Sequence, residues 1–237
     1  MNRLAVFAAT AMFAVLYVPA AHATLQLRIT DTLGNSVDIG DNNSTAPSCV
    51  GVLAATCTDA NPVANALTFM GTIGGWDINV TTGTSKSASD PDLIHLNSLD
   101  HTNGQGGTLT LMLSDDGYTP GNSGGFNVTF GPTISGNNAT VTYQAYEDDT
   151  TKFALTNAIG PLITFHTSGS QSVSGGPAVS PSGYALTQVV TLSFADGRGN
   201  VSFDATIDPV PEPASVVLLG GILLCSATVL RRRLNRA

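Results

Sequence analysis

Short stretches in which apolar and polar residues alternate recur along the middle of this chain, and helical periodicity is nearly absent. In residues 25–30, for example, Leu25, Leu27 and Ile29 would face one side of a strand and the polar residues between them the other. Clusters of Gly, Asn, Asp, Ser and Pro separate these stretches, and Thr and Val, which β-strands favour, are abundant. The pattern predicts an all-β, β-sandwich-like domain. The other expected strands are residues 66–72, 76–82, 93–96, 108–113, 126–130, 140–143, 162–166, 186–194 and 201–207.

The connections between these strands are also indicated by composition. Gly74-Gly75 between two alternating stretches predicts a tight hairpin. The longest expected loops are residues 31–64, 83–92 and 168–183. The last of these is rich in Ser, Gly and Pro, as linkers are, but only two strands follow it. Because two strands alone are marginally stable, we expect a surface loop within one domain.

The charge of the middle region restricts its partners. Residues 24–210 contain four basic and sixteen acidic side chains, a formal charge of −12, whereas the whole chain carries −8. Such a surface repels nucleic acid and other anionic polymers. Hydrophobic residues make up 42% of the chain, enough for a packed core.

The N-terminus has the three parts of a secretory signal peptide. Arg3 supplies the positive charge, and residues 4–18 are apolar apart from one threonine. Pro19 then ends the apolar run, and the small residues Ala21 and Ala23 stand where signal peptidase requires them. An uncleaved membrane anchor is the alternative, but the run is shorter than the roughly 20 residues of a span. We expect export by the Sec machinery and cleavage after Ala23.

The C-terminus has a second apolar segment of a different kind. Residues 214–230 carry no charge and as a helix would be about 26 Å long, enough for a bilayer core. Arg231, Arg232 and Arg233 follow at once, and positive charge beside a span stays in the cytoplasm. The alternative is a buried core helix, which rarely ends a chain in a cluster of arginines. We expect a transmembrane helix with an Arg-rich cytoplasmic tail, residues 231–237.

Just before this segment lies the motif of residues 210–215, in which Pro211 and Pro213 flank Glu212. The two prolines predict an extended stretch that cannot pair in a sheet. This motif, the apolar segment and the terminal arginines occur in the order of the PEP-CTERM sorting signal of Gram-negative bacteria, which residues 209–237 resemble. The predicted organisation is therefore a signal peptide (1–23), an acidic all-β ectodomain (24–208) and a sorting signal (209–237).

The resemblance implies a route and a set of partners. Proteins of this kind are exported, held by the C-terminal helix facing the periplasm, and recognised by the membrane enzyme exosortase. They are associated with exopolysaccharide and biofilm matrix. By this analogy Pro211, Glu212 and Pro213 are the recognition motif, the helix and its arginines are a transient anchor, and the final location is the cell surface or the extracellular matrix.

Cys49 and Cys57 are the only cysteines of the predicted ectodomain. In an oxidising compartment two such close cysteines predict a disulfide, worth about 2.5 kcal/mol for so short a loop. A redox or metal pair is the alternative, but the spacing is not CxxC and no histidine is nearby.

Other residues suggest chemistry only weakly. His95, His101 and His166 lack the spacing of a zinc site, and we expect polar surface histidines. The acidic stretch Asp38–Asn43 could supply oxygen ligands to Ca²⁺, the one cofactor that the sequence leaves open. Carboxylate pairs such as Asp115-Asp116 lie at expected strand ends or in turns, and turn chemistry explains them without catalysis. No nucleophile elbow, Walker loop or dinucleotide motif is present, so we assign no catalytic residue and no metal ligand.

Three functions agree with these features. The first is a non-catalytic, exosortase-processed surface or matrix protein. The second is a carbohydrate-binding module that stacks sugars on Trp76, Tyr118, Tyr143 and Tyr146, although a single tryptophan at the start of a hairpin is more often a core residue. The third is a secreted hydrolase built on the Asp-rich loops. We favour the first and expect no enzymatic activity.

Overall fold

The structure is a computed structural model that describes residues 25–43, 46–53, 57–87, 90–102, 106–118, 123–136, 138–176, 183–195 and 199–211. The predicted signal peptide, and the sorting signal from Glu212 onward, lie outside these residues. The described residues contain no helix that is long and apolar enough to cross a membrane.

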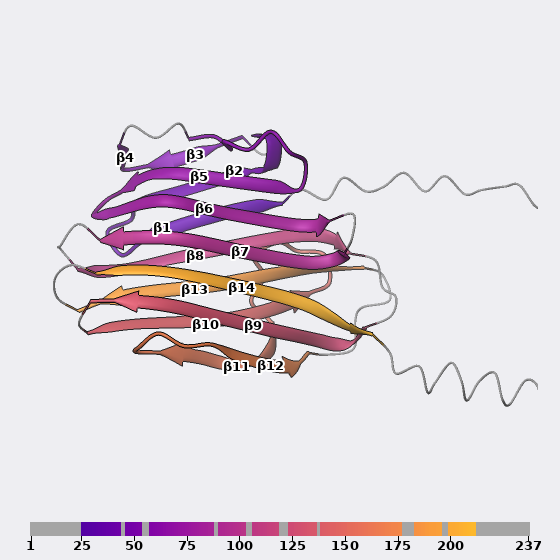
Figure 1. Ribbon diagram of the computed structural model, residues 1–237. Coiled ribbons are helices and arrows are strands. Elements are labelled where there is room, and N and C mark those ends of the chain that lie inside the picture. Colours follow the sequence, from indigo (N-terminus) through magenta and orange to yellow (C-terminus); the bar gives the residue numbers. More distant parts are fainter. Residues whose placement is uncertain are drawn as a thin grey trace, which may run out of the picture.

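Two antiparallel seven-stranded sheets face each other and form a sandwich (Figure 1). Sheet A has the order β11 (Asn157–Phe165), β10 (Ala139–Asp148), β13 (Tyr184–Phe194), β8 (Gly107–Tyr118), β1 (Gln26–Asp31), β2 (Ser36–Gly40) and β3 (Ser48–Val50). Sheet B has the order β12 (Gln171–Gly175), β9 (Ser123–Ser135), β14 (Asn200–Pro211), β7 (Asp90–Thr102), β6 (Trp76–Ser87), β5 (Ala66–Ile73) and β4 (Val52–Leu53). A short 3₁₀ turn, η1 (Asp41–Asn43), follows β2.

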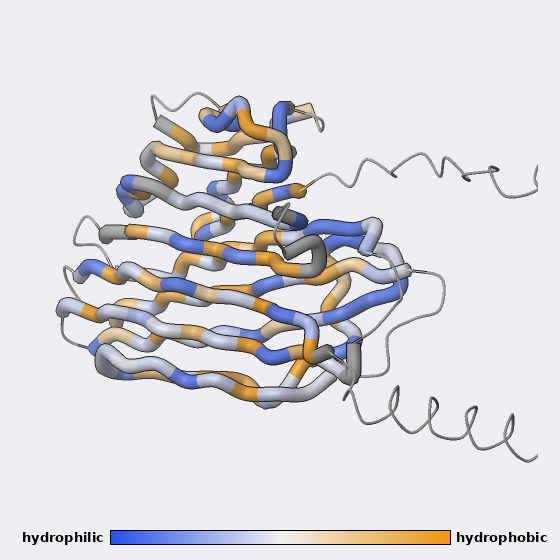
Figure 2. The backbone as a smooth tube through the Cα atoms, turned by 45° about the vertical axis from the view of Figure 1, so that its right-hand side comes forward, coloured by the Kyte–Doolittle hydropathy of each residue, from blue (hydrophilic) through white to orange (hydrophobic). Residues whose placement is uncertain are grey.

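The core lies between the sheets and is built by the predicted alternation. Along β8, Leu109, Leu111 and Leu113 are fully buried, and polar or partly exposed residues stand between them. Figure 2 shows this alternation of hydrophobic and hydrophilic positions along the strands. Across the core, Phe130 of sheet B stacks on Tyr143 of sheet A, with ring centroids 4.7 Å apart. Burial of such rings is a major source of sandwich stability.

The predicted strands are all present, and the Gly74-Gly75 hairpin joins β5 and β6 as expected. The predicted loops, in contrast, contain further strands. The long loop 31–64 holds β2, β3 and β4, and β12 lies within residues 168–183. β6 and β7 extend through most of residues 83–92. These additions are strands because neighbours supply backbone partners, which local composition does not reveal.

The last strand also runs further than predicted. β14 pairs with β7 only as far as Ile207, but it pairs with β9 until Pro211 stands opposite Ser123. The expectation that the proline stretch cannot pair is therefore wrong for its first residues. Beyond Ile207 the strand has one neighbour instead of two, and an edge position tolerates a residue without an N–H group.

Candidate functional site

Both ends of the described chain lie at the same end of the sandwich, which we call the terminal end. β1 begins there, with Gln26 opposite Ser114 of β8, and β14 finishes there at Pro211. β8 ends and β9 begins at this end as well, with Ser123 of β9 opposite Pro211. In Figure 1 it is the right-hand end of the sandwich. Pro211, the first residue of the predicted Pro-Glu-Pro recognition motif, is thus the last residue of β14.

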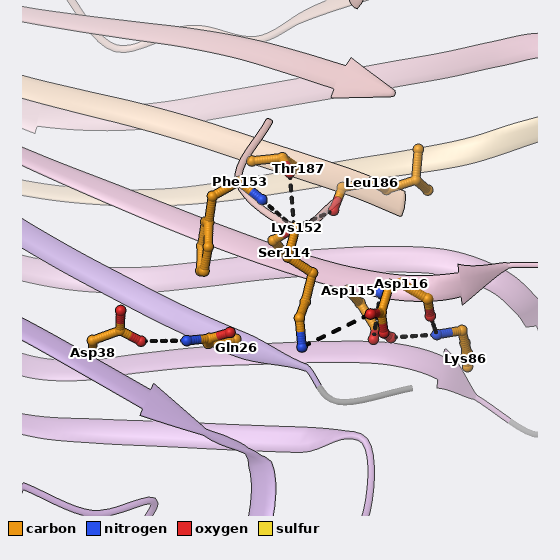
Figure 3. Close-up of polar contacts among 10 residues, drawn as sticks. All are labelled: Gln26, Asp38, Lys86, Ser114, Asp115, Asp116, Lys152, Phe153, Leu186 and Thr187. Carbon is orange, nitrogen blue, oxygen red and sulfur yellow. Dashed lines mark hydrogen bonds and ion pairs between the residues drawn. The ribbon is translucent and has the colours of Figure 1, made fainter. Parts of the chain in front are cut away.

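A charged group at the terminal end connects the two sheets. We call Lys86, Asp115, Asp116 and Lys152 the Lys86 cluster (Figure 3). Lys86 Nζ of β6 donates to Asp115 Oδ2 of β8 at 2.7 Å and to the backbone carbonyl of Asp116. The ammonium also lies 4.2 Å from the centroid of the Tyr118 ring. Lys152 Nζ is 4.0 Å from the carboxylate of Asp116.

The central pair of this cluster is removed from solvent. The Asp115 side chain has no exposed surface, and 17% of the Lys86 side chain is exposed. Burial lowers the pKa of the Lys86 ammonium, while the Asp115 carboxylate beside it acts in the opposite direction. Sequence reasoning placed Asp115-Asp116 at a strand end or in a turn and explained the pair by turn chemistry. Both residues lie in β8, which ends at Tyr118, and Asp115 is buried, so the explanation by turn chemistry is wrong for it. Tertiary packing overrides the usual turn preference of aspartate.

The connection between β10 and β11 covers part of the outer face of sheet A. Within it, the Phe153 N–H donates to Ser114 Oγ at 3.1 Å, and Ser114 and Thr187 hydroxyls lie 2.8 Å apart. The Arg28 guanidinium stacks 4.2 Å from the centroid of the Phe153 ring and pairs with Asp38 at 2.7 Å. Through these contacts the β10–β11 connection packs on the outer face of sheet A, next to the Lys86 cluster. Sequence analysis missed the Lys86 cluster and the Arg28 contacts, although the scarcity of basic residues in a strongly acidic domain was a signal that those present would meet carboxylates.

Three of the four predicted sugar-stacking aromatics are core residues. Trp76 and Tyr118 are each 2% exposed, and Tyr143 is 1% exposed, so none offers a ring face to solvent. This corrects their assignment to a binding surface, because each occupies a strand position that faces the opposite sheet. Tyr146 alone is partly exposed, on the outer face of sheet A beside Thr187.

The acidic residues proposed for calcium mainly organise the chain. Asp38 accepts hydrogen bonds from Arg28 and Gln26. Asp41 accepts one from the Asn65 backbone at 2.8 Å; burial, assisted by nearby Asp59 and Asp115, raises its pKa. In the part of the chain that the structure describes, no three His, Cys, Asp or Glu residues are grouped to hold a metal ion. The calcium site stays a prediction.

The predicted histidines do not come together within the described residues. His95 of β7 contacts Asp204 of β14 on the outer face of sheet B. His166 lies 3.1 Å from the Thr140 hydroxyl near the edge of sheet A. The side chain of His101 lies outside the described part.

The predicted disulfide is present. Cys49 of β3 is bonded to Cys57, and their Cα atoms are 6.0 Å apart. Both residues pack against the core at the edge where the chain crosses from sheet A to sheet B. The disulfide therefore closes the stretch of chain that passes from sheet A to sheet B.

Two surface depressions accompany these features. One of about 460 Å³ lies beside the Lys86 cluster and is lined by residues 63–66 and 84–86. The other, about 200 Å³, lies at the opposite end of the sandwich between Asp31, Leu33 and the glycines 75, 106 and 107. In that second depression the Asp31 carboxylate accepts hydrogen bonds from the backbone of Leu33 and Asn35, so it shapes its own turn.

Comparisons with known proteins give a general likeness only. No protein-family model matches the chain, and no curated protein matches it. Among solved structures, the family 11 carbohydrate-binding module of Clostridium thermocellum in complex with a mixed-linked tetrasaccharide is 11% identical over 69% of this chain and 97% of its own, with a TM-score of 0.32. TmCBM61 in complex with β-1,4-galactotriose is 10% identical over 55% of this chain and 86% of its own, with a TM-score of 0.29. At these scores the likenesses carry no argument about function.

Proposed function

We propose that this protein is an exported, non-catalytic β-sandwich protein that an exosortase processes at Pro211, Glu212 and Pro213. After processing it resides at the cell surface or in the exopolysaccharide-containing matrix. The observation that supports this most is the end of β14 at Pro211, the first residue of the motif. Every strand that the structure describes lies before Glu212.

The position of the motif suits a processing enzyme. The last strand has lost its β7 neighbour after Ile207, so the chain leaves the sheet along one remaining partner. Cleavage just beyond Pro211 would remove none of the buried core residues that the structure describes, because the last of them in β14 is Ile207. The released domain would keep its fold.

The roles of the acidic side chains favour a structural domain over a hydrolase. Asp115 is paired with Lys86, Asp38 with Arg28, and Asp41 with backbone amides. A glycosidase needs two carboxylates that face a substrate across a cleft, one of them free to donate a proton. These three carboxylates instead stabilise the domain.

The first experiment is the C-terminal mass of the protein recovered from its native host. We expect a chain that ends between residues 211 and 215. A Pro211→Ala, Pro213→Ala variant should retain the tail, whereas the control Pro209→Ala, a proline outside the motif, should be processed normally. Retention of Arg231–Ala237 in the wild type would overturn the proposal and indicate a permanently tethered domain.

Carbohydrate binding is a second candidate function, supported by a row of hydroxyls on the outer face of sheet A. Thr30, Thr110, Thr191 and Thr142 are direct neighbours across β1, β8, β13 and β10, and all are partly exposed. Such a row offers neutral hydrogen-bonding groups on an acidic domain, which suits an uncharged polysaccharide better than an anionic one.

A sedimentation assay with purified neutral exopolysaccharide tests this second function. Saturable binding that is lost in Thr110→Val, Thr191→Val would support it. The control Thr133→Val changes an exposed threonine on the opposite sheet and should leave binding intact. Absence of wild-type binding would remove the second function and leave the processing proposal untouched.

A further inference from the structure

Lys86 and Asp115 are held together in an unusual local setting. Lys86 has a left-handed backbone, with φ of 45°, at an irregularity in the pairing of β6 with β7. Non-glycine residues rarely adopt this conformation, and such strain is found at sites where a side chain must be aimed. Here the strained residue directs its ammonium across the sandwich to a carboxylate of the other sheet.

The surroundings of this pair disfavour charge. Asp115 is fully buried, which works against its charge, whereas the Tyr118 ring 4.2 Å from the ammonium partly compensates the lysine for its lost hydration. A buried ion pair loses the hydration of both charges, and its mutual attraction often fails to compensate for that loss. Desolvation lowers the pKa of Lys86, so its surroundings favour the neutral amine more than water does.

We propose that Lys86 and Asp115 are the site of an intramolecular isopeptide bond that joins sheet B to sheet A. One proton first moves from the ammonium to the carboxylate, which leaves a neutral amine and a carboxylic acid. Nζ then attacks the Asp115 carboxyl carbon, a C–N bond forms and a C–O bond breaks. The departing hydroxyl takes one proton from Nζ and leaves as water, so the reaction needs no oxidant, reductant or further reactant.

Proximity favours the rate of this condensation. The nitrogen lies 2.7 Å from a carboxylate oxygen, and well-oriented intramolecular reactions reach effective concentrations of about 10⁵–10⁸ M. The product is a neutral amide, which removes two buried charges. The bond would connect β6 and β8 at the terminal end, where the chain leaves toward the sorting motif.

The other ion pairs of the domain serve as internal comparisons. Lys152 and Asp116 are 4.0 Å apart, and 31% of the Asp116 side chain is exposed. Arg28 and Asp38 are in contact, but a guanidinium remains protonated and does not act as the nucleophile. We therefore place the bond at Lys86 and Asp115 alone.

Peptide mapping of the purified, reduced and denatured protein tests the proposal independently of how its ends are processed. Trypsin cleaves after Arg28, Lys86 and Lys152, so an unlinked chain yields the peptides 29–86 and 87–152. A linked chain resists cleavage after Lys86 and yields one product, 29–152. We expect that product at a mass about 18 Da below the sequence value, the mass of one water. Separate peptides of full mass would overturn the proposal.

Matched variants identify the residues. Lys86→Arg keeps the positive charge but not the amine, and should restore the full mass. Lys152→Arg is the control and should retain the deficit of about 18 Da. Should Lys86→Arg fail to fold, the wild-type map together with fragmentation spectra that place the cross-link on Asp115 decides the question. A deficit located at Asp116 or another residue would contradict the assignment.

Discussion

Trp76 shows at the residue scale how strand position determines the role of a side chain. It faces the core, where its ring lies 5.7 Å from that of Phe194 in the opposite sheet. We predict that Trp76→Ala lowers the free energy of unfolding by about 3–5 kcal/mol, as large-to-small core changes do. Urea denaturation measures this, and Leu33→Ala, which changes an exposed side chain, should shift stability by less than about 0.5 kcal/mol. Wild-type stability in Trp76→Ala would contradict the core assignment.

Tyr143 and Gln188 form a buried polar connection. The Tyr143 hydroxyl donates to Gln188 Oε1 at 3.0 Å, and Gln188 Nε2 donates to the Ile94 carbonyl of sheet B. Tyr143→Phe would leave the Gln188 oxygen without this donor. We predict a loss of about 1–3 kcal/mol in the free energy of unfolding at neutral pH.

The same tyrosine predicts a pH dependence. Burial raises the pKa of Tyr143 well above its ordinary value. Its native form therefore stays protonated above about pH 10, where the unfolded tyrosine ionises, so stability is fully present below that pH and declines as the pH rises. Urea denaturation between pH 8 and about 11 should show a steeper decline for the wild type than for Tyr143→Phe. Parallel curves for the two proteins would rule out this contribution.

At the scale of elements, the disulfide stabilises the crossover from β3 to β4. These short strands lie at the edges of their sheets, and few backbone bonds hold them. We predict that Cys49→Ala, Cys57→Ala lowers the free energy of unfolding by about 2.5 kcal/mol, through the greater freedom of the unfolded chain. Thermal melting with and without reductant measures this. Reductant should bring the wild type to the level of the variant and leave the variant unchanged.

These edge strands also show the limit of prediction from sequence at this scale. The alternation of Leu109, Leu111 and Leu113 with polar residues predicts β8. Residues 48–50, which form β3, show no such alternation. β3 forms because β2 offers it backbone partners, and β2 in turn is aligned by β1. An edge strand depends on neighbours that are placed first, so its own residues carry little signal.

At the scale of the whole molecule, β14 joins the two halves of sheet B, and we expect cooperative folding of the sandwich to depend on it. It lies between β7 and β9, and Val201, Phe203 and Ile207 are buried. We predict that residues 24–211 unfold cooperatively, whereas residues 24–199 give no cooperative transition in urea. Loss of three large buried side chains costs about 5–9 kcal/mol, comparable to the total stability of a domain. A cooperative transition in the shorter chain would show that sheet B tolerates the missing strand.

The sequence by itself determined the strand-forming stretches, the Gly74-Gly75 hairpin and the disulfide, because each depends on residues close together in the chain. It also contains the two terminal signals, which stay predictions here. The tertiary structure alone decided that Tyr118 and Tyr143 are core residues and that Lys86 meets Asp115, which lies 29 residues further along and in the other sheet. Alternation specifies that a side chain faces inward, but the partner it meets there depends on the register and packing of both sheets.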